Sequence, residues 1–179
     1  SSWKQHIISG EHHLHTLDLA DFDGDGALDI LTGRLIFHTD TVESRHPVLI
    51  FYNRNGGMKW LEQGISMKGC YGAVAGDLDH DGYVDMVVPR NYNRGPVTLF
   101  RNSLRDAGRP LDQWTYTEMD RHRGKWGDEA SPEWLRYFGL DAADADGDGD
   151  LDLVSGRYYY RNPGGDMTAH WERNDLGMN

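Results

Sequence analysis

The chain has 179 residues and a formal net charge of −11, from 29 acidic and 18 basic residues. A chain of this length buries roughly 70% of its unfolded surface, so it can form a substantial core. Its single cysteine, Cys70, excludes an internal disulfide. No apolar run approaches the roughly 18 residues of a membrane-spanning helix. Basic residues never gather without acids beside them, which argues against nucleic-acid binding.

A nine-residue acidic loop occurs three times, at residues 21–29, 77–85 and 144–152. Each copy has aspartate at positions 1, 3, 5 and 9 and glycine at position 6. Four carboxylates so close together repel one another unless a cation lies among them, and Ca²⁺ binds six to eight such oxygens. The glycine permits the sharp turn that directs later ligands back to the ion. The pattern predicts three Ca²⁺ sites, and solvated acidic turns are the alternative.

The loops do not fit an EF-hand. An EF-hand needs a bidentate glutamate at position 12, where this chain has Thr32, Val88 and Ser155. Short apolar runs precede and follow each loop, and their length is typical of strands. Each loop is therefore predicted to join two strands of a hairpin.

A longer repeat surrounds these loops. Trp3, Trp60, Trp114 and Trp171 recur at spacings of 57, 54 and 57 residues. An aromatic residue followed by asparagine precedes the last three tryptophans, at Asn53, Asn102 and Asn162. Each unit reads as strand, acidic loop, strand, longer loop, strand, tight turn and strand, which describes a β-propeller blade.

We therefore expect an all-β protein, a β-propeller segment of three four-stranded antiparallel blades. The blades are predicted within about residues 11–66, 67–120 and 136–176. Residues 1–9 are predicted to form the outer strand of a preceding or closing blade. Residues 121–135 are predicted to form an inserted loop.

The segments from His15 to Gly33 and from Gly139 to Gly156 resemble FG-GAP or VCBS-type repeats. That family includes the propellers of integrin α-chains, bacterial secreted proteins, some lectins and some polysaccharide lyases. The resemblance covers nearly the whole chain and implies a calcium-binding propeller, but no single activity. It also implies the ligands, which are four aspartate side chains and the position-7 carbonyl of each loop. These are Asp21, Asp23, Asp25, Ala27 and Asp29; Asp77, Asp79, Asp81, Tyr83 and Asp85; and Asp144, Asp146, Asp148, Asp150 and Asp152.

The predicted strands do not close a propeller. Propellers usually have four to eight blades, and three blades would expose apolar sheet flanks. The last unit already has its own fourth strand at Trp171, so the N-terminal outer strand has no vacancy to fill. We expect either a segment of a longer propeller, with further blades or an upstream segment elsewhere in the parent chain, or self-association into a ring. A closed three-blade arrangement is a further alternative.

An arginine follows each loop five residues after its last aspartate, at Arg34, Arg90 and Arg157. In the family's architecture this position lies on the face opposite calcium, which is usually the binding face. Arginines there would bind carboxylates or sulfates through paired donors. The alternative is a structural role, in which each arginine pairs with an acid or carbonyl of a neighbouring blade.

Aromatic and histidine side chains are predicted on the same face. They are His13, before the first loop, and Trp126, Trp134 and Tyr137, within or beside the insertion. Aromatic and cationic residues in an inserted loop suit sugar binding. The alternatives are packing of the tryptophans over an adjacent blade and a merely solvated histidine.

These expectations favour a calcium-binding module that is secreted or at the cell surface, since weak calcium modules belong outside the cytosol. The family resemblance implies that this module is of bacterial origin. Its function would be binding or scaffolding, with glycan as the ligand. A polysaccharide lyase acting on uronate polymers is one alternative, because a histidine and a tyrosine beside an arginine can abstract a proton. A protein-adhesion module is the other. No catalytic residue is predicted.

Overall fold

The computed structural model describes residues 4–35, 44–90, 96–104, 114–120, 139–156 and 158–176. The elements whose bounds it describes are all β-strands. They are β1 (Leu14–Ala20), β2 (Asp29–Arg34), β3 (Val48–Arg54), β4 (Lys59–Ser66), β5 (Val74–Gly76), β6 (Asp85–Pro89), β7 (Val97–Asn102), β8 (Trp114–Asp120), β9 (Asp141–Ala143), β10 (Asp152–Ser155), β11 (Tyr158–Arg161) and β12 (Glu172–Asp175).

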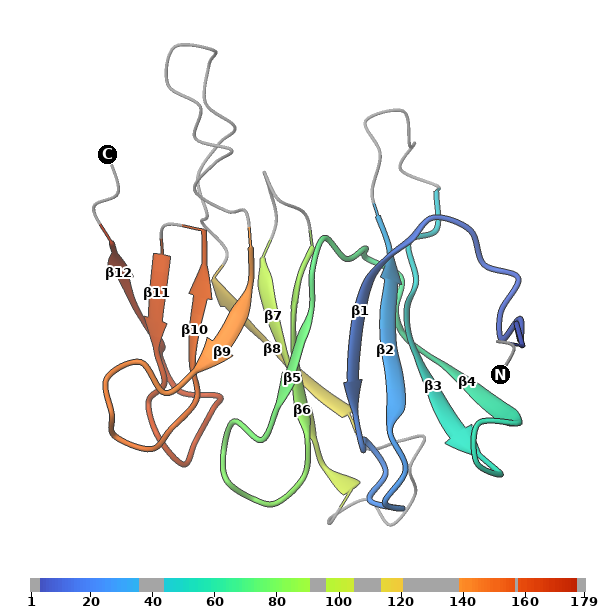
Figure 1. Ribbon diagram of the computed structural model, residues 1–179. Coiled ribbons are helices and arrows are strands. Elements are labelled where there is room, and N and C mark those ends of the chain that lie inside the picture. Colours follow the sequence, from blue (N-terminus) through green and yellow to red (C-terminus); the bar gives the residue numbers. More distant parts are fainter. Residues whose placement is uncertain are drawn as a thin grey trace.

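The strands form three four-stranded sheets, with the order β1-β2-β3-β4 in the first, β5-β6-β7-β8 in the second and β9-β10-β11-β12 in the third. Every pair of neighbouring strands is antiparallel. The sheets stand side by side in chain order, with β5 in contact with both β1 and β9 (Figure 1). The predicted all-β fold of three four-stranded antiparallel sheets is confirmed.

The N-terminal segment differs from the prediction. Residues 4–13 form no strand, although an outer strand was predicted over residues 1–9, and residues 1–3 lie outside the described residues. The segment cannot pair with any of the three described sheets, because the edge of each third strand is already taken by β4, β8 and β12; a role in a preceding blade stays a prediction. The segment instead lies at the end of the molecule formed by the first sheet (Figure 1).

Side chains from facing sheets make two separate hydrophobic clusters, one at each junction. Between the first and second sheets the cluster contains residues such as Phe22, Leu31 and Met86. Between the second and third sheets it contains residues such as Leu78 and Leu153. Successive strand residues point to opposite faces, so the second sheet contributes to both clusters.

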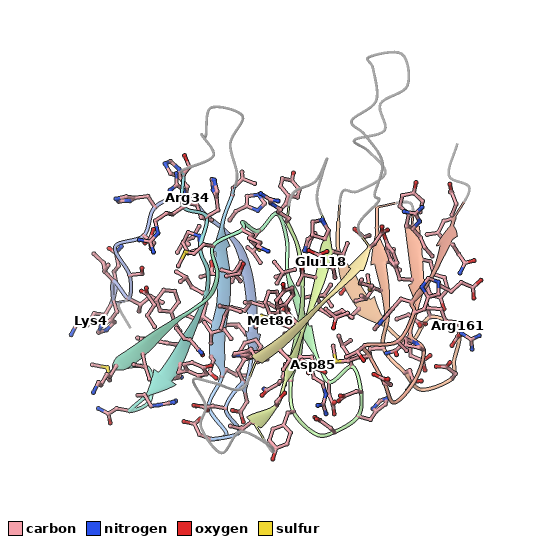
Figure 2. The ribbon with its side chains drawn as sticks, turned by 180° about the vertical axis from the view of Figure 1, so that it is seen from behind. Lys4, Arg34, Asp85, Met86, Glu118 and Arg161 are labelled. Carbon is pink, nitrogen blue, oxygen red and sulfur yellow. The ribbon has the colours of Figure 1, made fainter. Side chains whose placement is uncertain are left out.

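The strands of all three sheets begin and end along two opposite edges of the molecule (Figure 1), and these two edges differ in chemistry. The acidic loops that join β1 to β2, β5 to β6 and β9 to β10 gather along one edge (Figure 1). Arg34, at the end of β2, lies at the opposite edge from Asp85 (Figure 2). The predicted insertion at residues 121–135 lies outside the described residues.

Candidate metal centres and an inter-sheet groove

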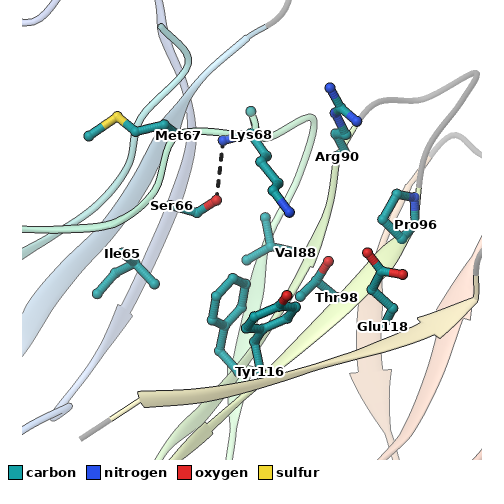
Figure 3. A pocket seen from close by; sticks show the side chains of 12 residues that line it. Ile65, Ser66, Met67, Lys68, Val88, Arg90, Pro96, Thr98, Tyr116 and Glu118 are labelled. Carbon is teal, nitrogen blue, oxygen red and sulfur yellow. Dashed lines mark hydrogen bonds between the residues drawn. The ribbon is translucent and has the colours of Figure 1, made fainter. Parts of the chain in front are cut away.

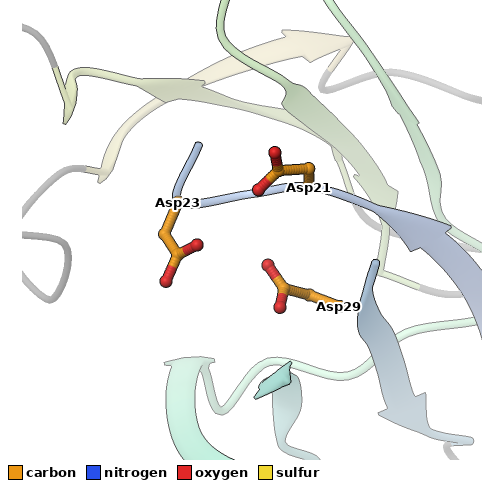
Figure 4. Close-up of side chains that lie close together, drawn as sticks. All are labelled: Asp21, Asp23 and Asp29. Atoms are coloured by element: carbon orange, nitrogen blue, oxygen red, sulfur yellow. The ribbon is translucent and has the colours of Figure 1, made fainter. Parts of the chain in front are cut away.

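Each acidic loop brings the carboxylates of positions 1, 3 and 9 together. In every copy, one oxygen from each of the three lies within 4.8 Å of the others. The clusters are Asp21, Asp23 and Asp29; Asp77, Asp79 and Asp85; and Asp144, Asp146 and Asp152. In Figure 4 the first three carboxylates surround a common space. Calcium–oxygen bonds are about 2.3–2.6 Å long, so oxygens on opposite sides of one ion would be about this far apart.

The position-9 aspartates Asp29, Asp85 and Asp152 are fully buried. Asp85 accepts two backbone hydrogen bonds, from Leu78 in its own loop at 2.9 Å and from Asn102 on β7 at 2.8 Å. The other two aspartates accept from the same two positions of their own units. Burial raises the pKa of Asp85 to about 7 and that of Asp29 to about 6, although the backbone hydrogen bonds oppose it.

The position-1 aspartates shape the turn. Asp21 accepts hydrogen bonds from the backbone of Gly24, Asp25 and Gly26 at 2.8–3.1 Å. The position-6 glycine has positive φ in all three loops, +86° at Gly26, +88° at Gly82 and +98° at Gly149. Other residues rarely adopt this conformation. The glycine therefore gives the loop the turn that collects its carboxylates.

At each loop one arginine forms ion pairs with the carboxylates of positions 3 and 5. We call this pairing the arginine clamp, and the sequence did not predict it. Arg101 on β7 pairs with Asp79 at 2.6 Å and Asp81 at 2.9 Å. Arg54 pairs in the same way with positions 3 and 5 of the first loop, and Arg161 with those of the third. The position-5 carboxylates thus lie in ion pairs, outside the three-residue clusters.

The signal for this clamp is an arginine beside the asparagine at or just after the end of each third strand. Arg101 and Arg161 precede their asparagines, whereas Arg54 follows Asn53. The two placements differ by two residues, which keeps the arginine on the same face of the strand. This shift hides the repeat when the sequence is read by fixed spacing.

The first loop offers a direct test of whether a cation fits. The Asp23 side chain is 4% exposed, and its Oδ1 is buried without a hydrogen-bond partner. A buried charged oxygen without a partner is costly, and a bound cation would supply one. The atoms available as metal ligands are carboxylate and carbonyl oxygens, which suit Ca²⁺.

A groove of about 310 Å³ lies between the first two sheets. One wall is formed by residues 65–69, at the end of β4, and the other by β6, β7 and β8 (Figure 3). Tyr116 is 61% exposed in this groove. The Lys68 Nζ lies 5.7 Å from the centre of its ring. Arg90 and Glu118 add a cation and an acid to the lining.

The predicted ligand-binding residues are not brought into one ring within the described part of the chain. Arg90 is exposed and lines the groove. Arg34 is partly buried, donates to the Arg45 carbonyl at 3.0 Å, and lines a different cavity of about 420 Å³. His13 is exposed, with φ of +62°. Four predicted residues lie outside the described residues: Trp126, Trp134, Tyr137 and Arg157.

Comparison with known proteins gives one relative and no family assignment. No protein-family model matches the chain. Over 111 residues the chain is 32% identical to integrin alpha-PS2 of Drosophila melanogaster. The alignment covers 52% of this chain and 8% of the integrin, so the chain spans less than a tenth of that relative's length. The relative is an insect protein and gives no support to a bacterial origin.

Within the described residues, no helix is long and apolar enough to cross a membrane. The similarity to an integrin α-chain agrees with three antiparallel four-stranded sheets and with an FG-GAP-like repeat. The chain is thus similar to a part of an integrin α-chain over about half of its own length.

Proposed function

We propose that the chain is a calcium-stabilised β-propeller segment that acts as an extracellular ligand-binding module. The observation that carries the proposal is repetition. The same three carboxylate positions converge in all three loops, and the position-9 carboxylates accept hydrogen bonds from equivalent backbone groups. Solvated acidic turns would not require the same convergence and the same hydrogen bonds in every copy.

In each loop the carboxylates of positions 1, 3, 5 and 9 and the carbonyl of position 7 would hold the ion. Calcium would neutralise carboxylates that now face one another. Three divalent ions add six positive charges, which takes the formal charge from −11 to −5. The ions would then stabilise the edge of all three sheets.

Thermal unfolding tests this part. At about 1 mM Ca²⁺ and a Kd of about 0.1 mM, mass action gives roughly 1.4 kcal/mol per site. We expect a chelator to lower the melting temperature. Ca²⁺ should restore it better than Mg²⁺, because Mg²⁺ demands a nearly ideal octahedral shell of ligands. The control is Asp166→Asn, which changes an exposed acid outside the loops and should leave the effect of Ca²⁺ on the melting temperature unchanged. Equal melting curves in chelator and in Ca²⁺ would exclude calcium stabilisation.

For the ligand, we propose an acidic sugar bound in the inter-sheet groove. The exposed Tyr116 ring offers an apolar platform for a sugar face. Arg90 offers paired donors to a carboxylate, and Lys68 adds a second positive charge close by. The acidic loops lie at the opposite edge of the sheets, where they repel such a ligand least.

Binding of galacturonate oligomers in saturating Ca²⁺ tests the groove. We expect Arg90→Ala to weaken binding by about tenfold, as the loss of a charged hydrogen bond implies. Its melting temperature should change little, because Arg90 is exposed. Arg45→Ala is the matched control, an exposed arginine outside the groove. A large stability loss with unchanged binding would assign Arg90 a structural role instead.

Protein adhesion is the second candidate, and the similarity to an integrin α-chain favours it. A glycan array beside a protein pull-down separates the two. The alternative of a polysaccharide lyase gains no support from the groove, because no histidine is among the described residues that line it. An absorbance assay at about 235 nm on uronate polymers would detect the unsaturated product of such a lyase.

A further inference from the structure

The second acidic loop departs from the repeat at position 4. The first and third loops have glycine at this position, Gly24 and Gly147, with φ of +74° and +81°. The second loop has His80 there, with φ of +56°. Residues other than glycine rarely adopt this left-handed conformation, and those that do often serve a function. The side chain of His80 is therefore the part of this loop whose role needs an explanation.

The third acidic loop departs from the repeat at position 7. The first and second loops have Ala27 and Tyr83 at this position, whereas the third loop has the acid Asp150. These two departures meet, because His80 Nε2 lies 2.8 Å from Asp150 Oδ1. We call this contact the His80–Asp150 bridge. It links the loop between β5 and β6 directly to the loop between β9 and β10, which lie along the same edge of the molecule (Figure 1).

Further contacts restrict Asp150. Its side chain is 23% exposed, and a Cβ atom on Gly164 would lie only 3.1 Å from its Oδ2. The carboxylate thus packs between the His80 ring and the backbone of Gly164. The amide of Asp150 donates to Asp148 Oδ1 at 3.1 Å. The position-7 amides of the other two loops make the same hydrogen bond, so the contacts of the side chain are what the third loop adds.

The first two loops are supported by the sheet that follows each of them. The Asn102 side chain donates to the carbonyl of Phe22, at position 2 of the first loop. The Asn162 side chain donates to the carbonyl of Leu78, at position 2 of the second loop. The equivalent residue of the third loop, Ala145, is exposed, and the structure describes no further sheet beside it. The bridge gives this loop a contact with the preceding loop instead.

We propose that His80 is a positioning residue that couples the second and third calcium sites. The proposal rests on the proposed function, in which the carbonyl of Asp150 is a ligand of the third site. Because the bridge restricts Asp150, the loop has less conformational freedom to lose when that carbonyl becomes a ligand. His80 lies between Asp79 and Asp81 of the second site. Order in the second loop therefore stabilises the bridge, and the coupling acts in both directions.

Each loop contains an amide that can report on its own site. The position-6 glycine amides, those of Gly26, Gly82 and Gly149, donate to the position-1 aspartate of the same loop at 2.8–3.1 Å. Titration of the full chain with Ca²⁺, followed by NMR at these three amides, gives a separate affinity for each loop.

His80→Gly removes the bridge and introduces the residue that the other two loops have at this position. We expect it to weaken Ca²⁺ binding at the third loop about fivefold. This is less than the tenfold or more typical of contacts to metal ligands, because the His80 side chain is 51% exposed. Binding at the first loop should not change. In an Asp150→Ala background, His80→Gly should have no further effect, because the bridge is already lost.

The coupling is tested by removing the second site. Asp79→Asn should weaken the third loop about twofold when His80 is present and should not weaken it in His80→Gly. The matched control is Asn55→Gly, which replaces another residue with φ of +56°, in the turn between β3 and β4. This control should leave the third loop unchanged.

Three results would overturn the proposal. The first is unchanged or tighter binding at the third loop in His80→Gly, since the histidine would then be no more than a nearby charge. The second is a further loss when His80→Gly is added to Asp150→Ala, or an equal loss in Asn55→Gly. The third is an Asp79→Asn effect that does not depend on His80. If no glycine amide of the wild type responds to Ca²⁺, the proposed calcium binding itself fails, and this coupling fails with it.

Discussion

The second and third acidic loops share a sequence pattern but differ in burial. The Asp79 side chain is 4% exposed, whereas the equivalent Asp146 is 29% exposed. The difference follows from what comes next in the chain. Asn162 and Trp171, which flank strands of the third sheet, pack beside the second loop, whereas the structure describes no further sheet beside the third loop. The same nine-residue pattern therefore acquires a different environment according to whether a further sheet packs against the loop.

The largest expected effect comes from the position-9 aspartates. Asp85→Ala should cost about 2–4 kcal/mol in free energy of unfolding, because it strands two buried backbone donors, those of Leu78 and Asn102. Asp152→Ala should cost less, since its donor Ala145 is exposed and can bind water. Urea denaturation in chelator measures both values. Equal losses of unfolding free energy would show that the sheet packed against the loop does not determine the cost of removing the position-9 aspartate.

The arginine clamps should show a smaller difference of the same sign. Arg101→Gln removes the cation beside the poorly exposed Asp79, and should cost about 1 kcal/mol in chelator. Arg161 is 51% exposed, so Arg161→Gln should cost no more than about 0.5 kcal/mol. In saturating Ca²⁺ both costs should shrink, because the ion takes over the neutralisation. Losses that persist unchanged in Ca²⁺ would argue that arginine and ion do not share these carboxylates.

The raised pKa values of Asp29 and Asp85, about 6 and 7, predict a pH effect of the opposite sign to the usual one. In chelator the folded state holds more protons than the unfolded state between about pH 4 and 7. Stability from these groups should therefore fall as pH rises through that window. Calcium favours the ionised forms, so its affinity should rise over the same window. Melting temperatures from pH 5 to 8, with and without Ca²⁺, check both trends.

The sequence predicted what is local and repeated. Carboxylate spacing, the position-6 glycine and the short apolar flanks each constrain a few neighbouring residues, and together they predicted the hairpins and the sheets. The junction could not be predicted in this way. Asn102 and Phe22 lie 80 residues apart and meet only because two sheets pack together. The outer strand predicted over residues 1–9 finds no partner in the three described sheets, because the outer edge of each is already filled by its own fourth strand, and for a preceding blade it stays a prediction.

The central claim is that each acidic loop binds one Ca²⁺, and calorimetric titration of the chelator-treated protein tests it most directly. We predict three bound ions, with the third loop the weakest because its carboxylates are the most exposed. Asp23→Asn, Asp79→Asn and Asp146→Asn should each remove one ion, the last removing the weakest. Fewer than three ions in the wild type, or three in every variant, would contradict the assignment.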